Sequence, residues 1–214
     1  MKKPKNLPNA AASTPLEKVD AAIADALIPL RADEAVLALG AASDLSDQEP
    51  LYAAAAATLA TAALMRDGRT WRAGTRLLAA HLLATALRGV VKAMVDRTRP
   101  EAAVRRGEYV LEEGRHRNSD LSSFPSGHTA GAVAFARALG RDYPGSRVPG
   151  LALAAAAGGA QVLRSKHFAS DVVAGAVIGW AAEALVDEVI GAAKKVRSHD
   201  IVPAQAGTSG IRRF

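Results

Sequence analysis

The sequence contains no cysteine, which excludes disulfide bonds, thiolate metal sites and a cysteine nucleophile. Aromatic residues make up only 4% of the chain, whereas 50% is hydrophobic and much of that share is alanine. The alternating pattern of β-branched residues that is typical of strands is hard to find. Alanine-rich segments favour helices that pack closely together. We therefore predict an all-α fold in one domain.

The N-terminal segment lacks the apolar stretch that follows the basic residues of a signal peptide. We therefore expect internal spans, rather than a leader, to place any exported part of the chain. Residues 1–15 are polar and contain proline, and residues 194–214 form a basic tail, so we expect both ends to be disordered. A single helical domain is expected over residues 16–193, beginning with short surface or interfacial helices at residues 16–44.

Long hydrophobic runs are also missing, because each apolar run is shorter than the roughly 20 residues that a full membrane span needs. The mean hydropathy of +0.07 is low for a protein with several spans, so a soluble helical bundle competes with a membrane-embedded one. The apolar runs are Leu51–Met65, Leu77–Val95, Val148–Leu163 and Val172–Ala182, and a further helix is expected at Ser126–Leu139.

Positive charge is distributed unevenly over the connecting segments. The expected basic loop at residues 66–77 has a charge of +3 and the tail after residue 193 has a charge of +4. The expected loop at residues 96–124 balances six arginines with six acidic residues. Because an excess of Lys and Arg marks the cytoplasmic side of a membrane, this asymmetry places residues 96–124 outside the cytoplasm. It favours a multi-pass protein of the cell inner membrane, with the number of spans left open.

A first group of polar residues lies at the end of the second apolar run. Helical spacing places Lys92 on the same face as His81 and Arg88. Charges within an apolar segment usually face a cavity or a partner. Arg88 by itself is more simply explained by a carboxylate partner or an interface. Pro100 is expected to end the helix and to direct Arg99 off its end, where a guanidinium can bind phosphate.

A second group follows in the sequence Phe-Pro-Ser-Gly-His-Thr at residues 124–129. Ser126 is a good N-cap for the helix expected after it. The unpaired N–H groups at a helix start bind anions, and Gly127 allows the backbone to approach a bound group. His128 would then lie beside that anion.

A third group contains His167 and Asp171, which are four residues apart and would share a helix face. A carboxylate that accepts one imidazole N–H leaves the other nitrogen available as a base or nucleophile. His81, His128 and His167 are spread over three segments without metal-ligand spacing, and carboxylates near them are few. We therefore expect no catalytic metal.

In this order, the three groups resemble the type 2 phosphatidic acid phosphatase superfamily, which includes lipid phosphate phosphatases, undecaprenyl-pyrophosphate phosphatases, class A acid phosphatases and vanadium haloperoxidases. Its first two motifs, Lys-x6-Arg-Pro and Pro-Ser-Gly-His, match fully. In the third motif, Ala160 and Gln161 stand where the family has serine and arginine, and Arg164 is the nearest cation. The resemblance covers residues 50–190.

The resemblance implies a metal-independent phosphatase that acts on a lipid or polyprenyl phosphate or pyrophosphate and requires no cofactor. His167 would become a phosphohistidine, Asp171 would orient it, and His128 would protonate the leaving oxygen. The net charge of +6 suits such an anionic substrate at a membrane, and we expect no nucleic-acid partner. The oligomeric state stays open. The phosphoryl oxygens would be bound by Lys92, Arg99, Ser126, Gly127 and either Arg164 or Gln161.

Three alternatives stay open. The chain resembles soluble acid phosphatases of the same superfamily, which act on small esters. A vanadium haloperoxidase would share the anion pocket, although the chain is short for that class. Because Gln161 brings no charge, a membrane protein that binds phospholipid headgroups without turnover is the third alternative.

Overall fold

The structure is a computed structural model that describes residues 14–114 and 118–200, so most of the two ends expected to be disordered lies outside the described residues. The described residues form eight α-helices, four short 3-10 helices and two three-residue strands. In order they are α1 Pro15–Leu27, η1 Ile28–Ala32, α2 Glu34–Ser43, η2 Asp44–Ser46, α3 Gln48–Met65, α4 Gly68–Met94, β1 Val95–Arg97, α5 Pro100–Arg106, β2 Leu111–Glu113, η3 Ser119–Leu121, α6 Gly127–Asp142, η4 Pro144–Ser146, α7 Arg147–Leu163 and α8 Ala169–Asp200.

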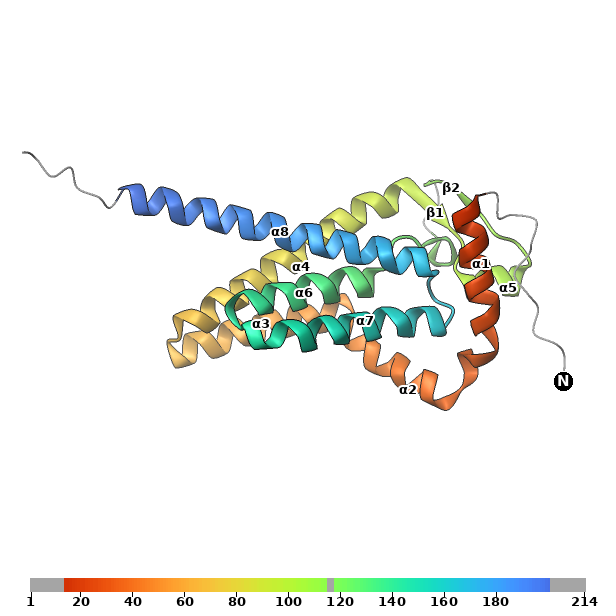
Figure 1. The fold of residues 1–214 in the computed structure, drawn as a ribbon, viewed down its shortest axis with the longest axis horizontal. Coiled ribbons are helices and arrows are strands. Elements are labelled where there is room, and N and C mark those ends of the chain that lie inside the picture. The colour runs from red at the N-terminus through yellow and green to blue at the C-terminus, as the bar shows by residue number, and fades with distance from the viewer. Residues whose placement is uncertain (1–13, 115–117, 201–214) are drawn as a thin grey trace, which may run out of the picture.

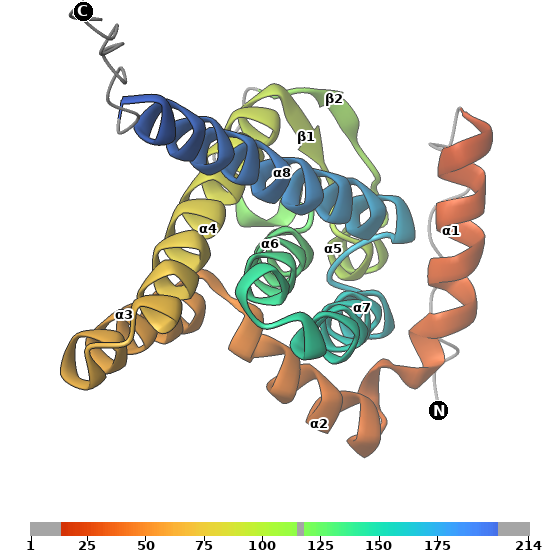
Figure 2. The ribbon, with the colours of Figure 1, turned by 60° about the vertical axis from the view of Figure 1, so that its left-hand side comes forward.

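Helix α6 is the centre of the bundle. It packs against α4, α7 and α8, while α3 packs along α4 and α2 along α7. Figures 1 and 2 show α1 standing across one end of the bundle, beside α5 and the β1–β2 pair. The two strands are antiparallel, with Val95 opposite Glu113. The prediction of an all-α bundle is confirmed, apart from this short strand pair.

The core between these helices is built largely from alanine, which lets α4, α6 and α8 approach closely. Gly175 and Gly179 on α8 lie directly against α6, where an added Cβ would collide with the backbone oxygens of Ser126 and Ala130. The Gly-x-x-x-Gly spacing therefore serves a contact within the chain.

Replacing Gly179 with leucine is expected to destabilise the bundle by about 1–3 kcal/mol or more, because the new side chain has no space against α6. The measurement is thermal unfolding of the purified protein in detergent. Gly191→Leu on the same helix is the control, because a Cβ at Gly191 meets no atom within 4 Å. Equal loss of stability in both variants would contradict close packing at Gly179.

The basic loop expected at residues 66–76 is mostly helix, so this prediction was wrong. Arg66 turns the chain with a left-handed φ of 52°. The Asp67 side chain then accepts hydrogen bonds from the backbone N–H groups of Arg69 and Thr70, at 3.0 and 3.1 Å. This cap starts α4 immediately after the turn.

Two other boundaries also differ from expectation. Pro100 does not end α4, which stops at Met94 where β1 begins; Pro100 is instead the first residue of α5. Proline is well suited to that first position because its missing N–H would be unpaired there anyway. At the other end, α8 continues through residues 194–200, which were expected to be disordered.

Charged side chains in the apolar helices pair within the bundle. Glu183 of α8 is only 1% exposed and accepts hydrogen bonds from Arg137 and Arg141 of α6, at 2.8 and 2.7 Å. Arg76 of α4 bonds to Asp187 of α8 at 2.5 Å. These pairs tie α4, α6 and α8 together at the end of the bundle opposite α1 and α5 (Figure 1).

Within the described residues, two helices are long and apolar enough to cross a membrane: Gly68–Met94 and Ala169–Ala193. Large apolar side chains face outward along the bundle. On α8, Val173, Val177 and Trp180 are each more than half exposed. Such an apolar outer face suits contact with lipid.

Candidate active site

The residues expected to carry chemistry gather at one end of the bundle. The end of α4, the starts of α6 and α8, and the end of α7 meet there, beside α5 and the strand pair (Figure 1). The predicted motif residues all lie in these helix ends or in the segments that adjoin them. The fold thus brings together three groups that lie far apart in the sequence.

His167 is buried, with 4% exposure, in the short segment between α7 and α8. Its Nδ1 lies 2.6 Å from the backbone oxygen of Ser123. Because a carbonyl oxygen only accepts hydrogen bonds, Nδ1 carries the proton and Nε2 keeps its lone pair. The tautomer required of a nucleophile is therefore set by the main chain before α6.

Asp171 does not accept the imidazole N–H directly, in contrast to the expectation from spacing. Its Oδ2 lies 3.7 Å from Nδ1 of His167, beyond hydrogen-bond distance. Instead, Asp171 accepts hydrogen bonds from the Ser123 hydroxyl at 2.5 Å and the Phe168 N–H at 2.8 Å. Ser123 thus bridges the two residues, contacting His167 through its carbonyl and Asp171 through its hydroxyl.

The sequence analysis missed Arg97, the residue that balances the charge of Asp171. Arg97 in β1 is 3% exposed and bonds to Asp171 at 2.5 Å and to Asp20 of α1 at 2.7 Å. Its guanidinium also lies over the Phe168 ring, 4.2 Å from the centroid. Burial alone would lower the pKa of Arg97, but Asp171 and Asp20 raise that pKa well above its ordinary value. Arg97 therefore stays charged.

Asp20 connects α1 to the site, although α1 was expected to be a surface or interfacial helix. Its carboxylate accepts hydrogen bonds from the N–H and the hydroxyl of Ser170 in addition to the Arg97 pair. Asp20 is buried with Glu17 and Ala24 on one face of α1. The helical spacing of Glu17, Asp20 and Ala24 was a local signal that this face of α1 is buried, but it does not indicate which residues Asp20 contacts.

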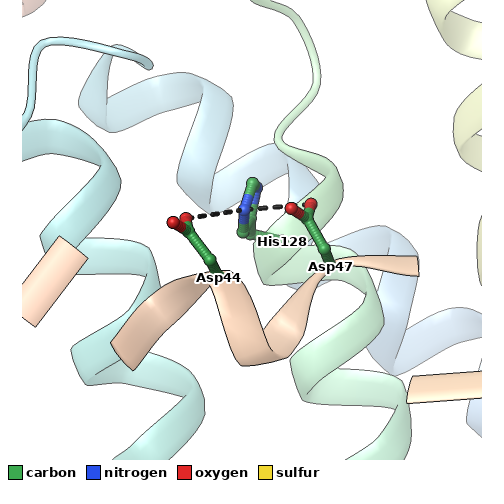
Figure 3. A group of neighbouring side chains, drawn as sticks. All are labelled: Asp44, Asp47 and His128. Carbon is green, nitrogen blue, oxygen red and sulfur yellow. Dashed lines mark ion pairs between the residues drawn. The ribbon is translucent and has the colours of Figure 1, made fainter. Parts of the chain in front are cut away.

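His128 opens the first turn of α6 and lies between two carboxylates (Figure 3). Its Nε2 is 3.0 Å from Oδ1 of Asp47 and 3.7 Å from Oδ1 of Asp44. The expectation that few carboxylates would lie near the histidines was therefore wrong. Ligand atoms of these three side chains lie within 4.8 Å of one another, which is the spacing of a cation site. Metal independence stays a prediction.

Lys92 and Arg99 lie together, as the first motif predicts. Lys92 lines a cavity of about 440 Å³ with residues of the segment before α6, including Ser119 and Ser122. Arg99 donates to the backbone oxygen of Ser119 at 3.0 Å and to the hydroxyl of Ser122 at 3.4 Å. The charges of Lys92 and Arg99 act on each other across this cavity.

The structure gives Gln161 and Arg164 other partners. Gln161 is 1% exposed and donates to the hydroxyl of Ser43 at 2.9 Å. Arg164 donates to the backbone oxygen of Gly40 at 3.1 Å and to Asp44 at 2.7 Å. Both side chains therefore hold the α2–η2 segment in place.

Ser126 occupies the N-cap position of α6, as expected, but its side chain makes no capping hydrogen bond. Its hydroxyl instead accepts a hydrogen bond from Thr129 at 3.1 Å. Gly127 is the first residue of the helix. A helix start of this kind presents N–H groups to an anion.

The chain is similar to known proteins in sequence and in fold. The family model described as "PAP2 superfamily" matches residues 73–193. Lipid A 1-phosphatase of Porphyromonas gingivalis is 37% identical over 81 residues, which cover 36% of this chain and 18% of that protein. The match thus spans less than a fifth of that relative. A crystal structure of a transmembrane PAP2-type phosphatidylglycerolphosphate phosphatase from Bacillus subtilis has a TM-score of 0.61 at 20% identity, covering 92% of both chains.

Proposed function

Because the chain belongs to the PAP2 superfamily, we propose that it is a metal-independent phosphatase that hydrolyses a lipid or polyprenyl phosphate or pyrophosphate. The observation that carries this proposal is the position of the proton on the imidazole of His167. Its Nδ1 proton is held by the Ser123 carbonyl, which leaves Nε2 as a nucleophile at the end of the bundle where cations and a helix start gather. This is the arrangement that phosphoryl transfer to a histidine requires.

In the first step, Nε2 of His167 attacks phosphorus and the bond from phosphorus to the leaving oxygen breaks. His128 donates a proton to that oxygen. The imidazole of His167 becomes positively charged, and Asp171 stabilises this charge from 3.7 Å. Burial is the largest effect on His128 and lowers its pKa below the ordinary value, while Asp47 and Asp44 act in the opposite direction and favour the protonated form that this step needs.

In the second step, water attacks the phosphohistidine and the bond from phosphorus to Nε2 breaks. His128, now neutral, accepts the proton of that water. Inorganic phosphate leaves, and His167 returns to its starting tautomer because Nδ1 remains bonded to Ser123.

The phosphoryl oxygens would be held by Lys92, Arg99 and the N–H groups at the start of α6. Arg164, through its pair with Asp44, and Gln161, through its bond to Ser43, position the α2–η2 segment. Phosphoryl transfer depends mainly on positioning and on stabilising spread negative charge. Side-chain cations and a helix start supply both without a metal ion.

The proposed substrate is a lipid phosphate because the chain offers membrane-spanning helices beside the site. Helices α4 and α8 meet the length and composition of a span, and outward apolar side chains surround them. The similar proteins are named for lipid A and phosphatidylglycerolphosphate. Arg66 in the turn after α3 and the arginines in the first turns of α4 lie at the opposite end of the bundle from the site, so we infer that the site faces away from the cytoplasm in the inner membrane.

The test is phosphate release by the purified protein in detergent, with and without EDTA. The substrates are phosphatidic acid, phosphatidylglycerophosphate, undecaprenyl pyrophosphate and a soluble phosphate ester. We expect at least ~10-fold higher kcat/KM for one of the lipids, because binding energy from its remote parts promotes turnover. EDTA should leave the rate unchanged.

Two outcomes would contradict the proposal. Equal or faster turnover of the soluble ester would identify a non-specific acid phosphatase. Binding of lipid phosphate without release would identify a headgroup-binding protein, as the neutral Gln161 allows.

A further inference from the structure

Arg88 of α4 lies against the first turn of α6. A Cβ added at Gly127 would overlap Nη1 of Arg88, so the guanidinium fills the space that this glycine leaves open. Arg88 is one helical turn before Lys92 on the same face of α4. The Arg88 side chain therefore extends from the same face of α4 as the Lys92 side chain.

Arg88 has no carboxylate partner among residues 14–114 and 118–200. Its one direct polar contact there is a long one, 3.5 Å from Nη2 to Oε1 of Gln48. Its Nε is buried without a hydrogen-bond partner. Arg88 as a whole is half-buried, and a guanidinium whose buried Nε lacks a partner is costly unless an anion completes its bonding. Of the two explanations expected for Arg88, a carboxylate partner or an interface, the first is therefore not met among these residues.

The charges around Arg88 indicate an anion as the missing partner. Lys92 and Arg99 repel it, and Asp47, which acts on it favourably, lies 3.0 Å from Nε2 of His128. Arg88 lies at the start of α6, and the charges of Lys92 and Arg99 are near enough to act on it. A phosphoryl group with two negative charges would relieve the repulsion among all three.

Arg164, the other arginine considered for phosphate binding after α7, makes its hydrogen bonds to other residues. Arg164 is bonded to Gly40 and Asp44, and neutral Gln161 is bonded to Ser43. Arg88 approaches from the opposite side of α6, on α4 instead of α7. It is therefore the arginine whose contacts leave it available to a bound anion.

We propose that Arg88 is a phosphate-binding residue of the active site, which grips the phosphoryl oxygens of a monoester or pyrophosphate beside the first turn of α6. This inference rests on the proposed function and deepens it. The guanidinium donates two hydrogen bonds to the oxygens, and it supplies the charge that Gln161 lacks.

The test is calorimetric binding of inorganic phosphate and orthovanadate to the full chain in detergent micelles. We expect Arg88→Gln to raise the Kd of both anions about ten- to a hundredfold, since it removes a charge-assisted contact. Arg72→Gln is the matched control, because Arg72 lies on the same helix at the far end and its side chain is 52% exposed. The Kd of the Arg72→Gln variant for both anions should match that of the parent.

Parental affinity in a folded Arg88→Gln variant overturns the proposal. If that variant does not fold, Arg88→Lys decides. An ammonium cannot make the two-pronged contact, so an unchanged Kd in Arg88→Lys also overturns the proposal.

The two hypotheses fail in different ways. A parent chain that binds both anions through Arg88 but hydrolyses no lipid phosphate contradicts the proposed function alone. A parent chain that hydrolyses a lipid phosphate, with Arg88→Gln binding phosphate at full affinity, contradicts the Arg88 assignment alone. A parent chain that binds neither anion overturns both.

Discussion

Replacing His167 with alanine is expected to reduce phosphate release from a lipid phosphate by ~10³-fold or more, because it removes the proposed nucleophile. Affinity for orthovanadate should fall far less, since the cations on α4 and the start of α6 remain. A second measurement follows the intermediate directly. Acid-sensitive, base-stable labelling of the protein by a radioactive phosphate donor should appear in the parent chain and disappear in His167→Ala.

Two results would contradict this role. Residual turnover within tenfold of the parent would mean that another group attacks phosphorus. A labelled intermediate that persists in the variant would place the phosphoryl group on a different residue. Thermal unfolding of both proteins controls for loss of structure, because His167 is buried and bonded to Ser123.

Replacing Arg97 with methionine is expected to destabilise the protein by about 3–5 kcal/mol. The change leaves Asp20 and Asp171, which are 2% and 0% exposed, without the cation that both contact. Activity should also fall, because Asp171 loses one of the groups that fix it beside His167. The measurement is the free energy of unfolding in detergent, together with phosphate release at a temperature where the variant is folded.

A matched control is Arg105→Met, since Arg105 is 60% exposed and pairs with Asp120 at the surface. Surface pairs contribute little, so its stability should stay near that of the parent. Adding Asp20→Asn to Arg97→Met should recover part of the loss by removing one stranded charge. Purely additive effects of the two changes would show that the charges do not interact.

The sequence supports the placement of most helices and of the motif residues, because those inferences depend on local spacing. The relation between His167 and Asp171 shows where local spacing fails. Their separation of four residues predicts a shared helix face, but α8 begins at Ala169, after His167. The rule for helical neighbours therefore does not apply to this pair, and the Ser123 carbonyl takes the place expected of the carboxylate.

The charged residues that pair with the site residues could not be predicted from local sequence patterns, for a different reason. Asp20 and Arg97 are 77 residues apart, and no periodicity within either segment indicates the other. Asp47 likewise meets His128 only because η2 folds across the start of α6. The role proposed for Arg88 depends on its lack of a carboxylate partner within the part of the chain that the structure describes, which a sequence does not show.

The contact between α1 and β1 limits how far the protein can be truncated at its N-terminal end. A truncated protein cut to residues 73–193, the range that the family model matches, would keep every motif residue. It would nevertheless lose Asp20 and, with it, half of the counter-charge that surrounds Arg97. Shortened versions for expression should therefore retain α1.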